Sequence, residues 1–151
     1  MSTSVLPTDL STCVAIYRTE YGIDAQVTDH GRIVVHVGDV GCIRLPAELG
    51  EVVADELARQ GLSTPVIVDE KSSSWRFLTQ RPTASPLFDP LFPHHAKQSG
   101  YGAEISLPTP GYPGRTWHVE PTGPHRLASE VVVDIALEKA EAMTKSAVGI
   151  S

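Results

Sequence analysis

The chain has 151 residues, a formal charge of −6 at pH 7, and 41% hydrophobic against 20% charged residues. This length predicts one domain that buries roughly 70% of the surface exposed by the unfolded chain. The negative charge argues against general nucleic-acid binding, which needs clustered Lys and Arg. No apolar run approaches the roughly 20 residues of a membrane span, and the N-terminus lacks a secretory signal, so we expect a cytoplasmic protein with no membrane partner.

The first third of the chain predicts a helix, a hairpin and a further strand. Apolar residues at spacings of 4, 3 and 4 predict a helix that begins at Thr8 or Asp9 and ends at Gly22. The β-branched segment 25–37 surrounds an Asp-His-Gly turn, which predicts a hairpin. Residues 42–45 predict the next strand.

The middle of the chain predicts a second helix, a second hairpin and a long loop. An apolar stripe over residues 46–61 predicts a helix that lies across the sheet. Gly50 inside it costs about 1 kcal/mol relative to Ala, unless a close contact requires glycine. Two strand-like runs around a polar turn make 65–79 the clearest hairpin. Residues 80–102 form a proline-rich loop without a sustained period, and such loops usually bind, close over a site, or are disordered.

The last third predicts two strands, 103–107 and 115–119, and a helix from Ser129 to about Met143. Two segments are expected to be flexible tails: residues 1–7 and 145–151. The order of elements favours a single two-layer α+β domain over residues 1–151. We expect a mostly antiparallel sheet of about five to seven strands, with about three helices on one of its faces.

The motifs of metal and covalent catalysis are missing from the sequence. Adjacent residues on extended chain point in opposite directions, so His94 and His95 are poorly placed to share one metal ion. His118 and Glu120 have the spacing of half a zinc-deaminase motif, but its cysteine half is missing. The two cysteines are expected to be free and buried: Cys13 and Cys42. We therefore expect no catalytic residue, no metal ion and no cofactor.

Aromatic and basic side chains concentrate in the segment 75–117, which contains seven of the nine aromatic residues. Residues 71–126 carry six basic and three acidic groups, a local charge of +3. Such side chains bind phosphate or carboxylate groups, and they are also enriched at the centres of protein interfaces. The candidate binding residues are Arg81, Phe88, Phe92, His94, His95, Lys97, Tyr101, Arg115 and His118. The apolar side chains of the 80–102 loop could dock on the protein's own sheet, on a second copy in a homodimer, or on a partner.

A set of motifs between about Cys42 and Glu120 supports a family resemblance. The motifs are Leu45-Pro46 with Leu49-Gly50, Pro65-Val66, Trp75 with Phe77-Leu78-Thr79, Gly102, Leu107-Pro108 and Trp117. The segment resembles short, uncharacterised proteins of high-GC bacteria that are related to the N-terminal domain of bifunctional DNA primase/polymerases. The resemblance implies an α+β fold and nucleotide binding. Active members have an acid-x-acid metal pair, whereas Asp69 and Glu70 are adjacent here, so the resemblance implies a domain without polymerase activity.

Three functional hypotheses follow. The first is a non-enzymatic binding or regulatory module that recognises a partner protein or a small anionic ligand through residues 80–125. The second is a divergent primase/polymerase-like nucleotide-binding domain with a site around Asp69, Glu70 and His118. The third is a small-molecule enzyme in which His94, His95 or His118 acts as a general base.

Overall fold

The structure, a computed structural model, describes residues 9–82 and 90–147. Its helices are α1 (Leu10–Thr19), α2 (Ala47–Arg59) and α3 (Ser129–Ala147), with a short 3-10 turn η1 (Phe92–His94). Its strands are β1 (Gln26–Val27), β2 (Ile33–His36), β3 (Gly41–Pro46), β4 (Val66–Asp69), β5 (Ser74–Thr79), β6 (Lys97–Gln98), β7 (Glu104–Ser106) and β8 (Arg115–Val119). The described residues thus hold three α-helices and eight strands, which confirms the α+β prediction.

The eight strands form two sheets, and every strand pairing in them is antiparallel. The larger sheet has the order β6-β3-β5-β4-β8, and the smaller sheet has the order β1-β2-β7. We had expected a single sheet. The difference arises because β7 pairs with β2, with Val35 opposite Ile105, whereas β8 pairs with β4. The proline-rich connection between β7 and β8 therefore carries the chain from one sheet to the other.

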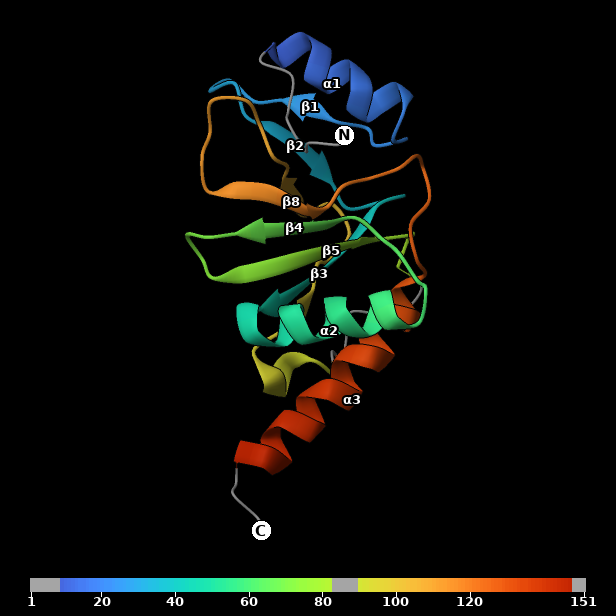
Figure 1. Cartoon of the computed structure of the whole chain (residues 1–151). Coiled ribbons are helices and arrows are strands. Elements are labelled where there is room, and N and C mark those ends of the chain that lie inside the picture. The colour runs from blue at the N-terminus through green and yellow to red at the C-terminus, as the bar shows by residue number, and fades with distance from the viewer. Residues whose placement is uncertain (1–8, 83–89, 148–151) are drawn as a thin grey trace.

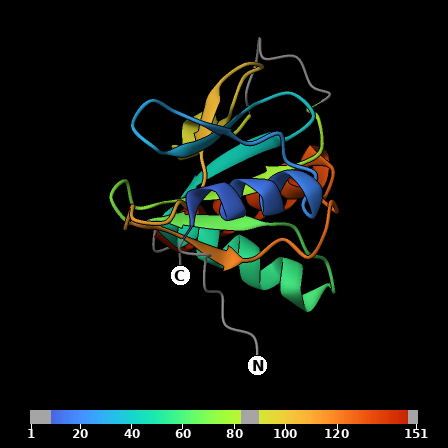
Figure 2. The same cartoon turned by 90° about the horizontal axis from the view of Figure 1, so that it is seen from above.

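The larger sheet is covered on both of its faces (Figure 1 and Figure 2). Helices α2 and α3 pack on one face, and α1 with the smaller sheet covers part of the other. The expected two layers, with all helices on one face, therefore differ from the observed arrangement. Helix α1 lies on the second face because its buried residues Cys13, Val14 and Tyr17 pack there. Tyr17 meets Trp117 of β8 edge to face, with ring centroids 6.0 Å apart.

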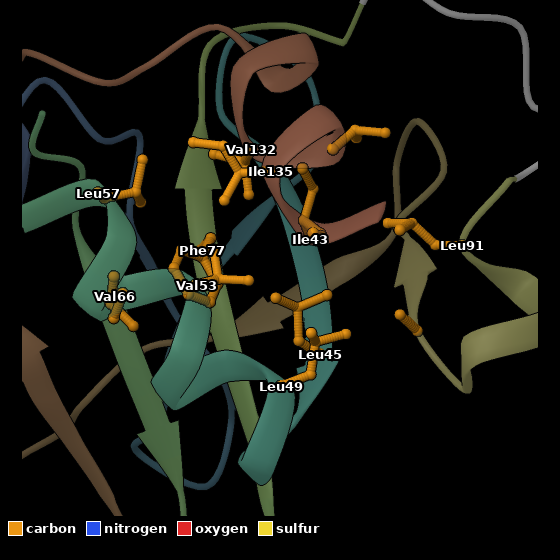
Figure 3. Packing of buried hydrophobic residues seen from close by; sticks show 14 of the residues in the cluster. Ile43, Leu45, Leu49, Val53, Leu57, Val66, Phe77, Leu91, Val132 and Ile135 are labelled. Atoms are coloured by element: carbon orange, nitrogen blue, oxygen red, sulfur yellow. The ribbon is translucent and has the colours of Figure 1, made fainter. Parts of the chain in front are cut away.

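Two hydrophobic cores share the larger sheet. The first core lies between the sheet and helices α2 and α3, and Figure 3 shows several of its side chains: Ile43, Leu45, Val53, Leu57, Val66 and Phe77. The second core lies between the sheet and α1, and it includes Tyr17, Cys42, Ile67, Leu78 and Ile105. Successive side chains of a strand point to opposite faces. Neighbouring residues of β3, β4 and β5 therefore contribute to different cores.

Gly50 allows α2 to approach β5 closely. The residue is buried, and a Cβ atom at this position would lie 2.6 Å from the Trp75 Cβ and 2.8 Å from its Cγ. Real Cβ atoms essentially never come this close to another heavy atom. Trp75 therefore packs so closely against α2 that position 50 requires glycine.

Helix α1 begins at an aspartate cap, within the expected bounds. The Asp9 carboxylate accepts hydrogen bonds from the Thr12 amide at 2.9 Å and from the Thr12 hydroxyl at 2.7 Å. Because the first-turn amides of a helix lack intrahelical partners, Asp9→Ala should lower the free energy of unfolding by about 1 kcal/mol. Urea unfolding measures this loss. A loss no larger than that of Asp24→Ala, an exposed control, would contradict the prediction.

Both predicted hairpins are confirmed. Strands β1 and β2 pair across a turn in which Gly31 has a φ of 79°. Strands β4 and β5 pair from Val66 opposite Phe77 to Asp69 opposite Ser74. In each case the turn residues and the strand pattern lie close together in sequence, so local rules are sufficient.

The 80–102 segment is more regular than a loop in its described part. It contains η1 and the short strand β6, which pairs with β3. Leu91 and Ala96 are buried in the first core and anchor the segment against the domain (Figure 3 labels Leu91). Phe88 and the expected tail at 1–7 lie outside the described residues, and α3 continues beyond the predicted end to Ala147.

Two further predictions can be compared with the described part of the chain. Cys13 and Cys42 are free and buried, as expected. None of the described helices is long and apolar enough to cross a membrane.

Candidate functional site

A row of three basic residues crosses the larger sheet on the face that also bears Cys42. Lys97 of β6 lies opposite Arg44 of β3, and Arg44 lies opposite Arg76 of β5. Strand alternation places Arg44 two residues from Cys42, on the same face. We call Lys97, Arg44 and Arg76 the basic row. Because adjacent strands are about 4.8 Å apart, the Cα atoms of the three residues lie within about 10 Å of one another.

Burial raises the pKa of the Cys42 thiol to about 11, while the charges of Arg76 and Arg44 act in the opposite direction. This electrostatic effect agrees with the placement of both guanidinium groups beside Cys42. The thiol is buried and stays protonated at neutral pH, so it is not a nucleophile. The groups on this face that can interact with a ligand are therefore its cations.

Asp69 binds one cation of the basic row, Arg76, and a neighbouring cation, Arg115. Its Oδ2 atom lies 3.2 Å from Arg76 Nη2 and 3.3 Å from Arg115 Nε. Its Oδ1 atom accepts hydrogen bonds from the amides of Lys71 at 3.1 Å and Ser72 at 3.3 Å. One carboxylate thus serves two guanidinium groups, which leaves this cluster with a positive charge.

The pKa of Asp69 is lowered although the side chain is almost fully buried. Burial acts to raise this pKa, and it is outweighed by the Ser72 amide, the charges of Arg115 and Arg76, and the Lys71 amide. The side chains of Arg76 and Arg115 are 17% and 23% exposed, so part of each guanidinium reaches the surface. The buried Arg115 Nε has no well-aligned hydrogen-bond acceptor among the described residues. Asp69 therefore orients both guanidiniums without satisfying all of their donors.

Two members of the basic row have no acidic partner among the described residues, whereas the third, Arg76, is paired with Asp69. No hydrogen bond or ion pair engages the side chains of Arg44 and Lys97 within residues 9–82 and 90–147, and both residues are exposed. Like charges directly opposite each other on neighbouring strands are destabilising. Arg44 is flanked by such a charge on both sides. An anion bound over the row would remove this repulsion.

The other predicted binding residues do not form one site. Arg81 forms an ion pair with Asp39 at 2.6 Å, and both side chains are largely exposed. The ring of Tyr101 lies 3.8 Å from the position of a Cβ atom added to Gly38, and Tyr101 is 85% exposed. This group lies near the C-terminal end of β5. Arg115 lies toward the other end, opposite Asp69 of β4, which in turn lies opposite Ser74, the first residue of β5.

His118 is not brought together with Asp69. Its ring contacts the Trp75 ring, with centroids 4.5 Å apart, on the face that carries α2 and α3. Asp69 points to the opposite face, where Arg76 and Arg115 use its oxygen atoms. The described residues contain no group of three or more His, Cys, Asp or Glu arranged to hold a metal ion. The hypothesised nucleotide site around Asp69, Glu70 and His118 is thus divided between two faces.

His94 and His95 are brought together at a pocket, in spite of their adjacent positions. The chain turns sharply here, because His95 has a left-handed φ of 60°. The pocket has a volume of about 340 Å³, and its lining residues are Pro46, Glu48, Leu49, Pro93, His94, His95, Ala140, Met143 and Thr144. It lies against helices α2 and α3 and the Pro46 end of strand β3. Phe92 is 79% exposed on the same 3-10 turn.

The candidate list from the sequence omitted Arg44 and Arg76. Each is the single charged residue among the apolar side chains of its strand, in the segments GCIRLP and SWRFLT. This pattern could have singled them out, because a strand with both faces covered is normally apolar throughout. Their juxtaposition with Lys97 depends on strand order, which is not a local property of the sequence.

Comparisons with known proteins add no functional assignment. Neither protein-family models, nor curated proteins, nor solved structures give a match to this chain. The resemblance to primase/polymerase domains therefore stays a prediction.

Proposed function

We propose that this protein is a non-enzymatic binding module for a small anionic ligand, which docks on the basic row. The observation that carries the proposal is the alignment of Lys97, Arg44 and Arg76 on three neighbouring strands. Lys97 and Arg44 have no acidic partner within the described parts of the chain. A further cation, Arg115, shares the Asp69 carboxylate with Arg76 of the row.

The donors of this site match phosphate or carboxylate oxygens. Guanidinium groups offer planar pairs of N–H donors, and charge-assisted hydrogen bonds of this kind are the strong ones. Arg76 is oriented by Asp69 before any ligand arrives, which lowers the entropic cost of binding. The side chains of Arg44 and Lys97 are exposed, so they can move to contact the bound anion. The overall charge of −6 favours a small ligand over an extended nucleic acid.

The proposal predicts that Arg44→Gln weakens anion binding without weakening the fold. Losing a charge-assisted hydrogen bond costs about 1.5–3 kcal/mol, which corresponds to an affinity about 10- to 100-fold lower. Since the substitution also removes repulsion in the row, the unliganded variant should be as stable as the wild type or more so. Calorimetric titration with pyrophosphate and with citrate, at constant ionic strength, measures the affinities. Urea unfolding measures the stability.

Arg59→Gln is the matched control, because Arg59 is a surface arginine whose side chain is 72% exposed on α2. It changes the net charge by the same amount but leaves the basic row intact. We expect its anion affinities to equal those of the wild type. The proposal fails if the wild type binds neither anion, or if Arg44→Gln and Arg59→Gln bind them equally well.

A further inference from the structure

We infer that the pocket at η1 is a second ligand site, and that it takes a small apolar molecule bearing a protonated amine. The site is independent of the basic row, because it lies on the face of the larger sheet that carries α2 and α3. Its volume of about 340 Å³ is at the small end of the range typical of ligand pockets. The ligand class follows from the two kinds of lining residue.

The apolar part of the lining comes from four separate elements. Pro46 belongs to β3, Leu49 belongs to α2, Ala140 and Met143 belong to α3, and Pro93 belongs to η1. Leu49 and Ala140 also belong to the first core, so the floor of the pocket is part of the packed interior. The flexible Met143 side chain adapts to differently shaped apolar groups. A small aromatic ring or a branched alkyl group would complement this floor.

The polar part of the lining offers acceptors and one negative charge. Glu48 is the single lining residue with a formal charge at neutral pH. The Thr144 hydroxyl donates its proton to the Ala140 carbonyl oxygen at 3.0 Å, which leaves only lone pairs for a ligand. A neutral imidazole presents one acceptor nitrogen beside its one N–H donor. An ammonium group has three donors and no acceptor, so it complements this set.

The two histidines are held in place before a ligand binds. Leu91 and Ala96, on either side of them, are buried in the first core. The amide of His95 donates to the Phe92 carbonyl at 3.1 Å, and the amide of Ala96 donates to the Leu91 carbonyl at 3.3 Å. This closed turn fixes the backbone of residues 92–95 against α2 and α3. The pocket is therefore preformed in the structure, which favours binding of a rigid ligand.

The test compares three ligands of similar shape and different charge. These are 2-phenylethylamine, 3-phenylpropionate and 2-phenylethanol, added to the full ¹⁵N-labelled chain at pH 8. Amide resonances of α2, α3 and η1 report where each ligand binds and how tightly. We expect the amine to shift residues around Leu49, His95 and Thr144. We expect it to bind at least tenfold more tightly than the alcohol or the carboxylate.

Glu48→Gln is the decisive variant, and Glu51→Gln is its matched control. Both residues are exposed in α2, but only Glu48 lines the pocket. Glu48→Gln should reduce the affinity for the amine about tenfold and leave the weak binding of the alcohol unchanged, whereas Glu51→Gln should change neither. Three results would overturn the inference: no shifts at the pocket, tighter binding of the carboxylate than of the amine, or equal losses in the two variants. An unchanged amide spectrum without ligand confirms that each variant is folded.

Discussion

Asp69→Asn is expected to lower the free energy of unfolding by about 3 kcal/mol. The variant removes the carboxylate charge that compensates Arg76 and Arg115, while both guanidiniums stay mostly buried. Breaking a buried ion pair by removal of one partner is costly because a buried charge is left without compensation. Urea unfolding at pH 7 measures the loss.

Glu70→Gln is the control for Asp69→Asn, since Glu70 is the next residue and is exposed. It should change the free energy of unfolding by no more than about 0.5 kcal/mol, as surface substitutions usually do. A loss below about 1 kcal/mol for Asp69→Asn would show that Arg76 and Arg115 find other compensation.

The effect of Asp69→Asn should depend on pH in a defined direction. The pKa of Asp69 is lower in the folded protein than in the unfolded chain, for the reasons given above. Its carboxylate therefore contributes its full stability above the unfolded value of about 3.9. The contribution is lost as the pH falls through the lower folded pKa. The difference between wild type and Asp69→Asn should thus be constant near neutral pH and shrink in acid.

Gly50→Ala is expected to lower the free energy of unfolding by about 2 kcal/mol, although alanine is the better helix former. In an unconstrained helix interior the substitution would stabilise the protein by about 1 kcal/mol. Here the new Cβ atom would lie 2.6 Å from the Trp75 Cβ. The helix must therefore move away from β5, and the first core loses contacts on both sides of the gap.

The control for Gly50→Ala is the reverse change at an exposed position of the same helix. Ala58→Gly should lower the free energy of unfolding by up to about 1 kcal/mol through helix propensity alone. Both variants are compared with the wild type by urea unfolding. If Gly50→Ala stabilises the protein, α2 accommodates a methyl group and the close approach to Trp75 is not required.

The sequence predicted elements well where the determining residues are neighbours in the chain. Asp9 caps α1 and Gly31 shapes the first hairpin turn, and both effects act over a few residues. The strand β6 was missed because two residues carry no period, and it exists only through its pairing with β3. Local order was thus predictable, whereas the partner of each strand was not.

The candidate site shows the same limit. The sequence indicated that Arg76, Lys97 and Arg115 belong to a basic region, but not that Arg44 lies between Arg76 and Lys97. Alternation along a strand fixes the face of each arginine. Which strands are neighbours is decided by pairings between residues more than thirty positions apart, such as Arg44 with Arg76. The pocket at His94 and His95 likewise depends on how α2 and α3 pack, which no local pattern specifies.

The sharing of one sheet between two cores makes the domain thermodynamically indivisible. Val66 and Ile67 are consecutive residues, yet one packs under α2 and α3 while the other packs under α1. Separating either layer from the sheet would expose to water the apolar side chains that strands β3, β4 and β5 contribute to that core. The two halves therefore cannot melt independently, and the whole domain should unfold in a single cooperative transition. A ligand that stabilises either face consequently protects the other face as well.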